Sequence, residues 1–392
     1  MRLKGVFIGK TWEDGIMKAK MKAKIKRRRR MSPLKRFLVI LGSVVGCFLL
    51  LVVGYVMYFF IKFDRIEDRQ TLETNVNAKF DASAVCETDK EYSVMSYNLG
   101  FGAYSNTFDF FMDGGTQSWA DSENTVYKNL NGALNKIKVR TPEFVFLQEV
   151  DEHSTRSYYI NELEFIDLIL EDYDYTYAYN YYKSPFIIYP FEEPHGTITS
   201  GLATYSKYGI TEAHRRSLPI SDSFTKVIDL DRCYSVSRIP VNNGKELVLF
   251  NVHLSAYGSD ESVREGQTTM LFGEMQEEYE AGNYVICGGD FNHDLISPEG
   301  SEGYSTWACP FPRSVIPEHF SLAMDLLGEE NKNKLQMTCR DCNEPYTRGH
   351  TNEFIVDGFI VSDNVSVLDY KNLNTGYIYS DHEPVHMKFK LD

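Results

Sequence analysis

The feature that most constrains this chain is an uninterrupted apolar run near its N-terminus. Residues 37–61 are 25 consecutive residues without a charged side chain. At a rise of about 1.5 Å per residue, a helix of this length crosses a hydrocarbon core of about 30 Å with a slight tilt. The run therefore predicts one membrane-spanning helix, preceded by a tail formed by residues 1–36.

Basic side chains are concentrated in that tail, which holds 14 of the 41 Lys and Arg residues but only 2 of the 55 Asp and Glu residues. Lys and Arg are enriched on the cytoplasmic side of membrane helices, so the basic stretch 18–36 predicts a cytoplasmic N-terminus. Everything after residue 61 is then expected outside the cytoplasm, held at the cell membrane by a single span. A cleaved signal peptide is the alternative. The apolar run is longer than the usual stretch of about 7–15 residues, and no small-x-small cleavage site follows it.

The rest of the chain is strongly acidic. Residues 37–392 carry 27 basic and 53 acidic side chains, a net charge of −26. Residues 62–84 are polar without a strong period, which indicates a juxtamembrane stalk, and residues 85–392 are long enough for one large catalytic domain. Nucleic-acid binders usually carry a basic surface, so this charge disfavours a nuclease without excluding one.

Strand-like and helix-like segments alternate from residue 91 onward. Helices are expected near residues 123–138, 158–172 and 262–280, and strand-like apolar segments lie before, between and after them. Several neighbouring strands have no helix between them, which favours mixed sheets over a doubly wound parallel sheet. The predicted class is α/β.

Five polar clusters lie in this domain, and four of them directly end an apolar strand. They are YNLG at 97–100, LQEVD at 147–151, NVHL at 251–254, GGDFN at 288–292 and SDHEP at 380–384. Taken singly, an Asp or Asn after a strand is more often a turn former, and a His in an apolar strand more often a core residue. Strand ends of a layered α/β protein meet at one rim, so the co-occurrence of five clusters predicts one shared site.

The residue types in these clusters suit phosphate ester hydrolysis. A phosphate ester repels hydroxide, so its hydrolysis calls for a hard cation held by oxygen ligands, together with groups that orient water and protonate the leaving oxygen. The clusters supply carboxylates, amides and imidazoles, namely Glu149, Asp290, Asp381, Asn98, Asn292, His253 and His382.

This ordered set resembles the endonuclease/exonuclease/phosphatase superfamily, which includes deoxyribonuclease-I-like nucleases, neutral sphingomyelinases and inositol-polyphosphate phosphatases. The resemblance covers about residues 91–392, and its most specific pair is GGDFN followed far downstream by SDHEPV, with LQEVD before them. It implies a four-layer sandwich of two packed mixed β-sheets flanked by helices, here preceded by one transmembrane helix. It also implies a Mg²⁺-dependent phosphoric ester hydrolase, with Mn²⁺ as the alternative ion.

The resemblance further implies a role for each site residue. Glu149 would be the principal metal ligand, with Asn98 and Asp381 completing or bordering the metal site. Asp290 would orient or activate the attacking water, and Asn292 would hold the phosphoryl oxygens. Asp357, within FIVDGFIV at 354–361, matches the carboxylate that pairs with the terminal histidine. His382 would then be an acid or base held by Asp357, and His253 a second acid or base opposite it.

Two local features leave alternatives open. Where the family often has G-N-A, this chain has Ser200-Gly201-Leu202-Ala203, so Tyr205 is only a candidate for the family's active-site tyrosine. Cys339 and Cys342 form a C-x-x-C with only Cys309 nearby, which favours a loop disulfide or free thiols over zinc. Cys287, in an apolar strand, is typical of a buried free thiol.

The substrate is expected to depend on loops. The stretch 181–195 is rich in Tyr, Phe, Ile and Pro, which suits binding of a lipid surface, a sugar or a base, or else a satellite core under a long loop. Anchoring and acidity favour a phosphodiesterase or phosphatase acting on lipid headgroups or small phosphorylated metabolites. The alternatives are a membrane-anchored extracellular nuclease and a non-catalytic binding protein on the same scaffold.

Overall fold

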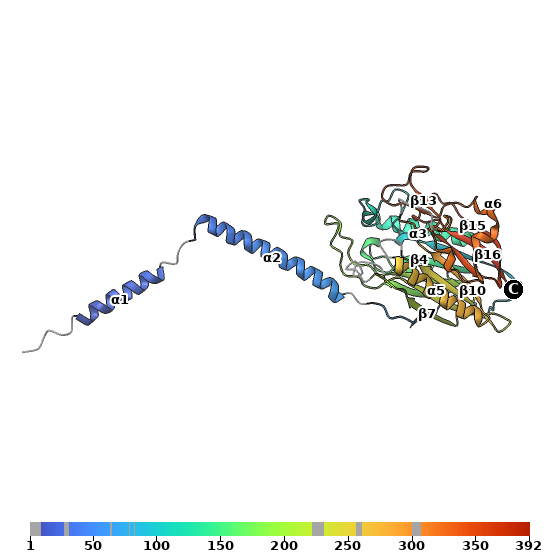
Figure 1. Cartoon of the computed structure of the whole chain (residues 1–392), viewed down its shortest axis with the longest axis horizontal. Coiled ribbons are helices and arrows are strands. Elements are labelled where there is room, and N and C mark those ends of the chain that lie inside the picture. The colour runs from blue at the N-terminus through green and yellow to red at the C-terminus, as the bar shows by residue number, and fades with distance from the viewer. Residues whose placement is uncertain are drawn as a thin grey trace, which may run out of the picture. The chain divides into compact units, whose positions relative to one another are not determined.

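The computed structural model of the chain describes residues 9–26, 31–62, 65–77, 79–81, 83–221, 231–255, 261–299 and 307–392. The chain divides into two compact units, Met1–Ile61 and Lys62–Asp392. The first contains α1 (Gly9–Lys26) and most of α2 (Pro33–Lys62), drawn in blue in Figure 1. Helix α2 includes the predicted apolar run, and by length and composition it is able to cross a membrane.

The second unit is built on two seven-stranded mixed sheets, as predicted (Figure 1). The order in one sheet is β1 (Gln70–Thr71), β7 (Glu212–Ser217), β8 (Cys233–Pro240), β9 (Glu246–His253), β10 (Tyr284–Asp290), β14 (Asp357–Ser362) and β11 (Phe320–Leu322). The order in the other is β15 (Val365–Asn372), β16 (Val385–Leu391), β3 (Glu91–Asn98), β4 (Phe144–Asp151), β6 (Ser200–Ser206), β5 (Asp174–Tyr181) and β2 (Asn75–Val76). A separate pair joins β12 (Cys339–Arg340) to β13 (Glu353–Phe354).

The main core lies between the two sheets, where apolar side chains from both inner faces pack together. Phe146 of β4 meets Phe359 of β14 across this layer, with ring centroids 6.2 Å apart. Helix α5 (Glu261–Glu280) adds Leu271 and Met275 to the same core from the outer side of the first sheet. The second sheet buries its other face against α3 (Glu123–Arg140) and α4 (Glu162–Asp167). The predicted four-layer sandwich flanked by helices is therefore confirmed.

Local signals explain where the helices begin and end. Ser122 caps α3 by accepting a hydrogen bond from the Thr125 amide, and α3 matches the helix predicted near 123–138. Helix α4 is shorter than the segment predicted at 158–172. Tyr158 and Tyr159 have positive φ angles of 56° and 60°, which a continuous helix excludes, so the helix begins only after them. The remaining short helices are α6 (Glu329–Lys332) and 3₁₀ turns at Gly100–Gly102, Phe111–Asp113, Thr155–Ser157, Arg313–Val315 and Ala323–Leu327.

Part of the segment predicted as a stalk lies on the second unit. Strand β1 pairs with β7, and β2 pairs with β5, so this segment extends one edge of each sheet. Arg65 also binds Asp231 through its guanidinium, with Nη2 2.8 Å from Oδ1.

Two parallel strand pairs set the position of the site. Strand β3 runs parallel to β4, and β9 runs parallel to β10, whereas the other pairings are antiparallel. In register, Asp290 lies opposite both His253 of β9 and Asp357 of β14. Asn98 lies opposite Gln148, the residue before Glu149. The polar strand ends predicted from the sequence thus meet at one rim.

Candidate active site

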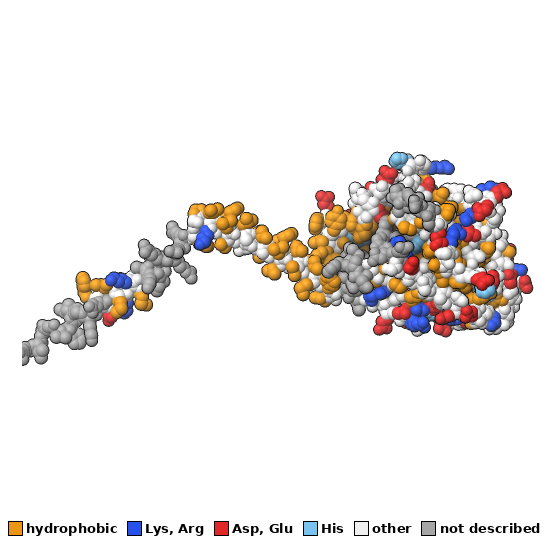
Figure 2. All heavy atoms as spheres, in the orientation of Figure 1, with side chains coloured by type: hydrophobic (Ala, Val, Ile, Leu, Met, Phe, Trp, Pro, Cys, Tyr) orange, Lys and Arg blue, Asp and Glu red, His pale blue; other side chains and the backbone are white. Residues whose placement is uncertain are grey.

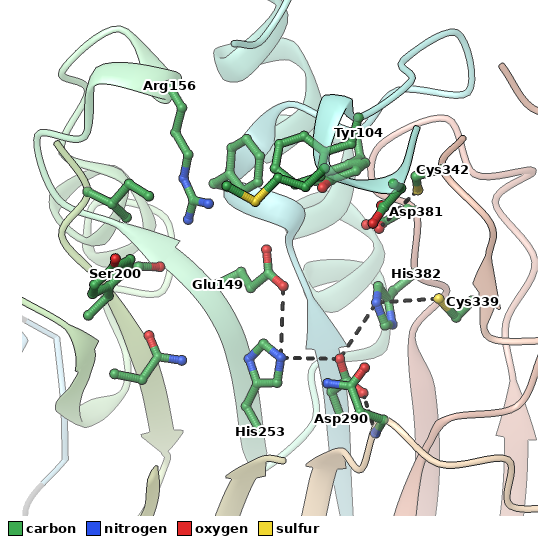
Figure 3. A pocket seen from close by; sticks show the side chains of 18 of the residues that line it. Tyr104, Glu149, Arg156, Ser200, His253, Asp290, Cys339, Cys342, Asp381 and His382 are labelled. Atoms are coloured by element: carbon green, nitrogen blue, oxygen red, sulfur yellow. Dashed lines mark hydrogen bonds and ion pairs between the residues drawn. The ribbon is translucent and has the colours of Figure 1, made fainter. Parts of the chain in front are cut away.

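A cavity of about 440 Å³ opens at this rim (Figure 3). Six of the residues predicted from the sequence line it, namely Glu149, His253, Asp290, Asn292, Asp381 and His382. The other two, Asn98 and Asp357, are buried beside them. The structure therefore brings all eight predicted site residues together, although they come from five separate motifs and one further strand, β14.

Asn98 is the polar centre of the group. Its Oδ1 accepts a hydrogen bond from the Gly100 amide at 3.0 Å, which orients the side chain. Its Nδ2 then donates to Glu149 Oε1 at 3.2 Å and to Asp290 Oδ2 at 3.0 Å. Ser380 donates from Oγ to the Asn98 carbonyl at 2.8 Å, which ties the SDHEP loop to the end of β3. One amide therefore holds carboxylates from both sheets in a fixed relation.

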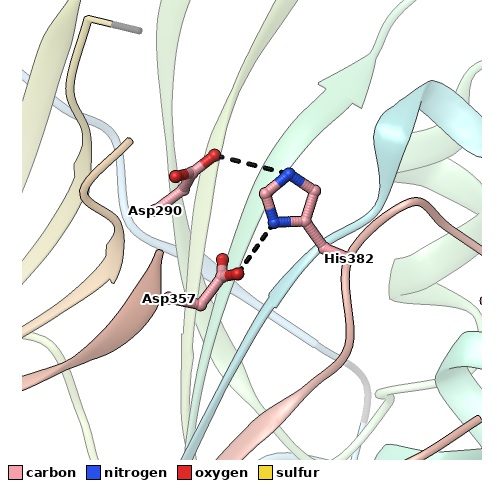
Figure 4. Close-up of side chains that lie close together, drawn as sticks. All are labelled: Asp290, Asp357 and His382. Atoms are coloured by element: carbon pink, nitrogen blue, oxygen red, sulfur yellow. Dashed lines mark hydrogen bonds and ion pairs between the residues drawn. The ribbon is translucent and has the colours of Figure 1, made fainter. Parts of the chain in front are cut away.

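His382 and Asp357 form a buried pair (Figure 4), with Nδ1 2.8 Å from Oδ2. The Asp357 amide donates to Thr338 Oγ1 at 3.1 Å, which fixes the start of β14. Burial opposes a charged imidazole, but the negative charges of Asp357, and then of Cys339 and Asp290 when ionised, hold the pKa of His382 well above its ordinary value. The raised pKa favours the imidazolium form of the ring, whose Nε2 lies 3.7 Å from Asp290 Oδ2.

His253 lies on the other side of Asp290 (Figure 3), with Nε2 3.6 Å from Asp290 Oδ2 and 3.9 Å from Glu149 Oε1. Both distances are too long for hydrogen bonds. Among the described residues its buried Nδ1 has no partner. Burial, followed by the positive charges of Arg232 and His382, lowers the pKa of His253 well below its ordinary value. The lowered pKa favours the neutral form of this imidazole.

The carboxylates are crowded and short of positive charge. Burial, and then the charge of Asp357, raises the pKa of Asp290 to about 6, against the opposing effect of His382. Burial and the charge of Asp381 raise the pKa of Glu149. Carboxylate and amide oxygens are the ligands that Mg²⁺ prefers, and a divalent cation would offset this crowding. Glu149 and Asp381 offer carboxylate oxygens that suit such an ion, whereas Asn98 Oδ1, the one atom of that side chain able to bind a cation, already accepts a hydrogen bond from the Gly100 amide.

Asp290, Asp357 and His382 form a second group that could hold a metal, with ligand atoms within 4.8 Å of one another. The hydrogen bond from His382 to Asp357 already engages two of these groups. The carboxylate of Glu149 is more open than those of Asp290 and Asp357, because the Glu149 side chain is 23% exposed.

Backbone strain also marks this rim. Glu149 and Asn292 have φ angles of 53° and 51°, a left-handed conformation that is uncommon for residues with a Cβ. Asn292 is held there by two hydrogen bonds, from its amide to Asp290 Oδ1 and from Nδ2 to the Leu254 carbonyl, both at 2.8 Å. Such strain persists where the surrounding structure fixes it, and it is concentrated at functional sites.

The structure corrects one candidate and settles the state of the cysteines. Tyr205 lies in the core, where its hydroxyl donates to Asp167 Oδ1 at 2.6 Å, and it does not line the cavity. All seven cysteines are free thiols. Cys339 Sγ lies 3.6 Å from His382 Nε2, and Cys342 donates to Asp381 Oδ2 at 3.3 Å, so the C-x-x-C pair lies at the cavity.

Three lining residues were not singled out by sequence analysis as site residues. Arg156 binds both oxygens of Asp151 at 2.9 Å and lies over the Phe101 ring at 3.7 Å. Asn180 is buried, and neither of its amide atoms has a partner among the described residues. Arg232 likewise has Nε and Nη1 without described partners. The sequence marks Arg232 only as one of 27 basic residues in the acidic part of the chain after residue 36, and nothing local distinguishes Asn180.

Comparisons with known proteins agree with this geometry. The model of the Endonuclease/Exonuclease/phosphatase family matches residues 95–382. No curated protein sequence matches the chain. Similar solved structures include endonuclease/exonuclease/phosphatase proteins from Beutenbergia cavernae DSM 12333, at 14% identity over 77% of this chain and 72% of that one with a TM-score of 0.51. Another is from Leptotrichia buccalis C-1013-b, at 15% identity over 76% of this chain and 100% of that one, with a TM-score of 0.51.

A third, from Bacteroides vulgatus, shows 15% identity over 78% of this chain and 100% of that one, with a TM-score of 0.50. At such low identities these likenesses show the fold alone. The family model, by contrast, spans all five polar motifs from the strand that carries Asn98 to His382. This chain therefore belongs to the endonuclease/exonuclease/phosphatase family.

Proposed function

We propose that this protein is a membrane-anchored, Mg²⁺-dependent phosphate ester hydrolase, with Mn²⁺ as the alternative ion. Its substrates would be lipid headgroups or small phosphorylated metabolites outside the cytoplasm. The observation that carries the proposal is the convergence of Glu149, Asp290, His253 and His382 around Asn98 at one cavity. Neither sheet alone would supply this set.

Glu149, together with Asn98 and Asp381, would hold the metal ion. When bound, a divalent cation of this kind neutralises charge on the phosphoryl oxygens and favours ionisation of water. The raised pKa of Glu149, caused first by burial and then by Asp381, supports this assignment, because the same crowding that disfavours a bare carboxylate favours a cation.

The other residues would act on the water and the ester. Asp290, as a carboxylate, would orient the attacking water and accept its proton. His382, positively charged and held by Asp357, would face the phosphoryl and leaving oxygens. Asn292 would donate hydrogen bonds to the phosphoryl group, and His253 would stand opposite His382 as a neutral acid or base. The buried hydrogen bond between His382 and Asp357 supports this division of roles.

The location follows from the N-terminal part of the chain. Residues 1–36 would be the basic cytoplasmic tail, residues 37–61 the transmembrane anchor, and the domain that follows would lie outside. The length and apolar composition of α2 and the basic stretch 18–36 before it support this topology.

The two alternatives have less support. A nuclease would be expected to present basic side chains to a phosphate backbone. Arg156 is engaged by Asp151, and Arg340 donates to the carbonyls of Ser105 and Phe108, so two of the three arginines at the cavity are already committed. A non-catalytic scaffold would have no need to keep the full polar set, which is present here.

Turnover assays with the full chain in detergent test the proposal. p-Nitrophenyl phosphodiesters and monoesters, phospholipids and plasmid DNA would each be offered with Mg²⁺, with Mn²⁺ or with EDTA. We expect cation-dependent hydrolysis of small or lipid esters that exceeds hydrolysis of DNA. Turnover that persists in EDTA, or hydrolysis of DNA alone, would contradict it.

A further inference from the structure

We propose that the aromatic loop, defined as residues 182–193, docks on a zwitterionic lipid bilayer. The site described above would then act on phosphate esters carried by lipids in that bilayer. The choice of substrate rests on the proposed function, whereas the docking itself does not. The proposal draws on the exposure of the loop, its position at the cavity mouth, the covalent link to α2 and the local charge.

The aromatic loop turns large apolar side chains outward. Tyr182, Tyr189 and Phe191 are 47%, 57% and 76% exposed. Figure 2 shows hydrophobic side chains gathered where the green loop between β5 and β6 of Figure 1 projects from the domain. Exposed aromatic clusters of this kind are typical of surfaces that meet a partner, and Tyr is enriched where a membrane meets water.

The inner side of the same loop forms part of the cavity. Ile187 is buried and lines the cavity, as does Ile198 on the return toward β6. Met112, which is 51% exposed, also lines the cavity, and its neighbour Phe111 packs against Tyr189 with ring centroids 5.7 Å apart. Apolar surface is therefore continuous from the tip of the loop to the cavity mouth. A lipid that leaves the bilayer would keep its acyl chains against this apolar surface and out of water.

Covalent geometry limits how far this rim can lie from a bilayer that α2 crosses. Only residues 63 and 64 separate Lys62, the last residue of α2, from Arg65, which binds Asp231. Three residues of extended chain span about 10 Å, and this limit holds for any arrangement of the two units.

Hydrogen bonds place the attachment point on the cavity wall. Asp231 directly precedes Arg232, which lines the cavity. The Asp231 carbonyl accepts a hydrogen bond from Arg215 Nη2 at 2.9 Å, and Arg215 Nε donates to the Tyr179 carbonyl at 2.7 Å. The aromatic loop begins three residues after Tyr179. The chain is therefore fixed to the wall from which the aromatic loop starts.

The negative charge of the loop and of the chain after residue 36 favours one kind of lipid surface. Glu192 and Glu193 are exposed beside Phe191, and the chain after residue 36 carries a net charge of −26. An anionic surface would repel both, whereas burial of aromatic rings needs no charge. A bilayer of zwitterionic headgroups therefore fits the loop better than an anionic one.

Quenching by brominated lipids tests the docking without catalysis. The full-length Phe191→Trp variant would be reconstituted in EDTA into phosphatidylcholine nanodiscs with brominated acyl chains. The matched control is Leu368→Trp, at a 50% exposed position on β15. After subtraction of the wild-type signal from Trp12, Trp119 and Trp307, we expect at least about twofold more quenching for Phe191→Trp than for the control. Equal quenching, or more quenching in phosphatidylglycerol than in phosphatidylcholine, would overturn the proposal.

Turnover tests the consequence for substrate. Hexadecyl p-nitrophenyl phosphate in phosphatidylcholine vesicles would be compared with soluble methyl p-nitrophenyl phosphate, which has the same reacting group. We expect Tyr189→Ser/Phe191→Ser to lower kcat/KM about tenfold or more on the hexadecyl ester only. The control Val139→Ser/Leu368→Ser removes two exposed apolar side chains elsewhere, 73% and 50% exposed, and should change neither rate.

The outcomes separate the two proposals. Equal losses on both esters would mean that the loop shapes the cavity rather than docks, and unchanged rates on both would mean that the loop has no part in lipid access. Either result overturns the docking. Absence of metal-dependent turnover of both esters by the wild type, alongside the expected quenching, would instead overturn the proposed function and leave the docking standing.

Discussion

The buried pair of His382 and Asp357 offers a quantitative test of the proposed chemistry. His382 Nδ1 lies 2.8 Å from Asp357 Oδ2, and both side chains are almost fully buried. The Asp357→Asn substitution keeps the shape of the side chain but removes the charge that favours the imidazolium and fixes the ring. We therefore expect it to impair the same step as His382→Ala.

The size of the effect follows from this contact. A hydrogen bond to a charged group contributes about 1.5–3 kcal/mol, and about 1.4 kcal/mol corresponds to a factor of ten. Asp357→Asn should thus lower kcat/KM by about 10- to 150-fold. His382→Ala also removes the proton donor itself, and the loss should reach about 10²- to 10⁴-fold. Because Asp357 acts through His382, the double variant should match His382→Ala within about threefold, whereas independent groups would multiply their losses.

The assay is kcat/KM on a soluble ester at saturating Mg²⁺, with circular dichroism to verify the fold of each variant. The chain supplies its own control, because His319 Nδ1 lies 2.9 Å from Asp363 Oδ2 in a pair that is half exposed and does not line the cavity. Asp363→Asn repeats the same chemical change and should alter kcat/KM by less than about twofold. A double variant with multiplied losses, or wild-type activity for Asp357→Asn, would refute the assignment of Asp357 and His382 as one functional unit.

Four further predictions concern the metal, pH, topology and leaving group. Glu149→Gln should abolish turnover while keeping the fold, as should excess EDTA with wild type; full activity in either case contradicts the metal assignment. Burial, and then the charge of Asp357, raises the pKa of Asp290 to about 6. With metal bound, kcat/KM should fall in acid as the Asp290 carboxylate is lost. In EDTA, where no turnover is expected, thermal stability should fall as pH rises from about 4 to 6, since the folded state binds the extra proton. Protease added to intact spheroplasts should digest the domain after α2, and protection until lysis would reverse the orientation. Across esters of graded leaving-group pKa, His382→Ala should steepen the dependence more than His253→Ala; equal slopes would remove the assignment of His382 as acid.

The sequence was sufficient to predict the sheets and most of the site because both depend on local patterns. Asn98, His253 and Asp290 each end a buried strand, and a change from apolar to polar residues marks such an end. The parallel pairing that brings Asp290 opposite His253 is not a local property. The sequence predicts a shared rim from the co-occurrence of five polar clusters, but it does not predict this pairing.

Other parts of the site depend on long-range packing and left no local signal. Asn180 lines the cavity because the chain that leaves β5 folds back over it from residue 182 toward β6. No residue near Asn180 in the sequence indicates that the chain turns back. Tyr205 lies on β6, where every residue is buried, so only the structure shows that its hydroxyl meets Asp167 from α4 instead of the cavity. The early strands β1 and β2 have two residues each, which is too short for a periodic pattern.

The two histidines illustrate how one cavity shifts the pKa values of two buried rings in opposite directions. His382 faces carboxylates with both ring nitrogens, because Nδ1 bonds Asp357 and Nε2 lies 3.7 Å from Asp290. His253 is buried as deeply, but its Nδ1 has no described partner, and the positive charges of Arg232 and His382 act on it. Burial lowers the pKa of both rings, and only His382 has a hydrogen-bonded carboxylate to reverse that effect.

This asymmetry supports different proposed roles for the two rings. Against the effect of burial, the hydrogen-bonded carboxylate of Asp357 raises the pKa of His382, which favours the form that can protonate a departing oxygen, so we propose His382 as the acid. Asp290 Oδ2 lies 3.6 Å from His253 Nε2 and 3.7 Å from His382 Nε2, and a ring that already carries its proton cannot accept another. We therefore propose that Asp290 accepts the proton of the attacking water and that His253, whose lowered pKa favours the neutral form, is the ring able to relay it.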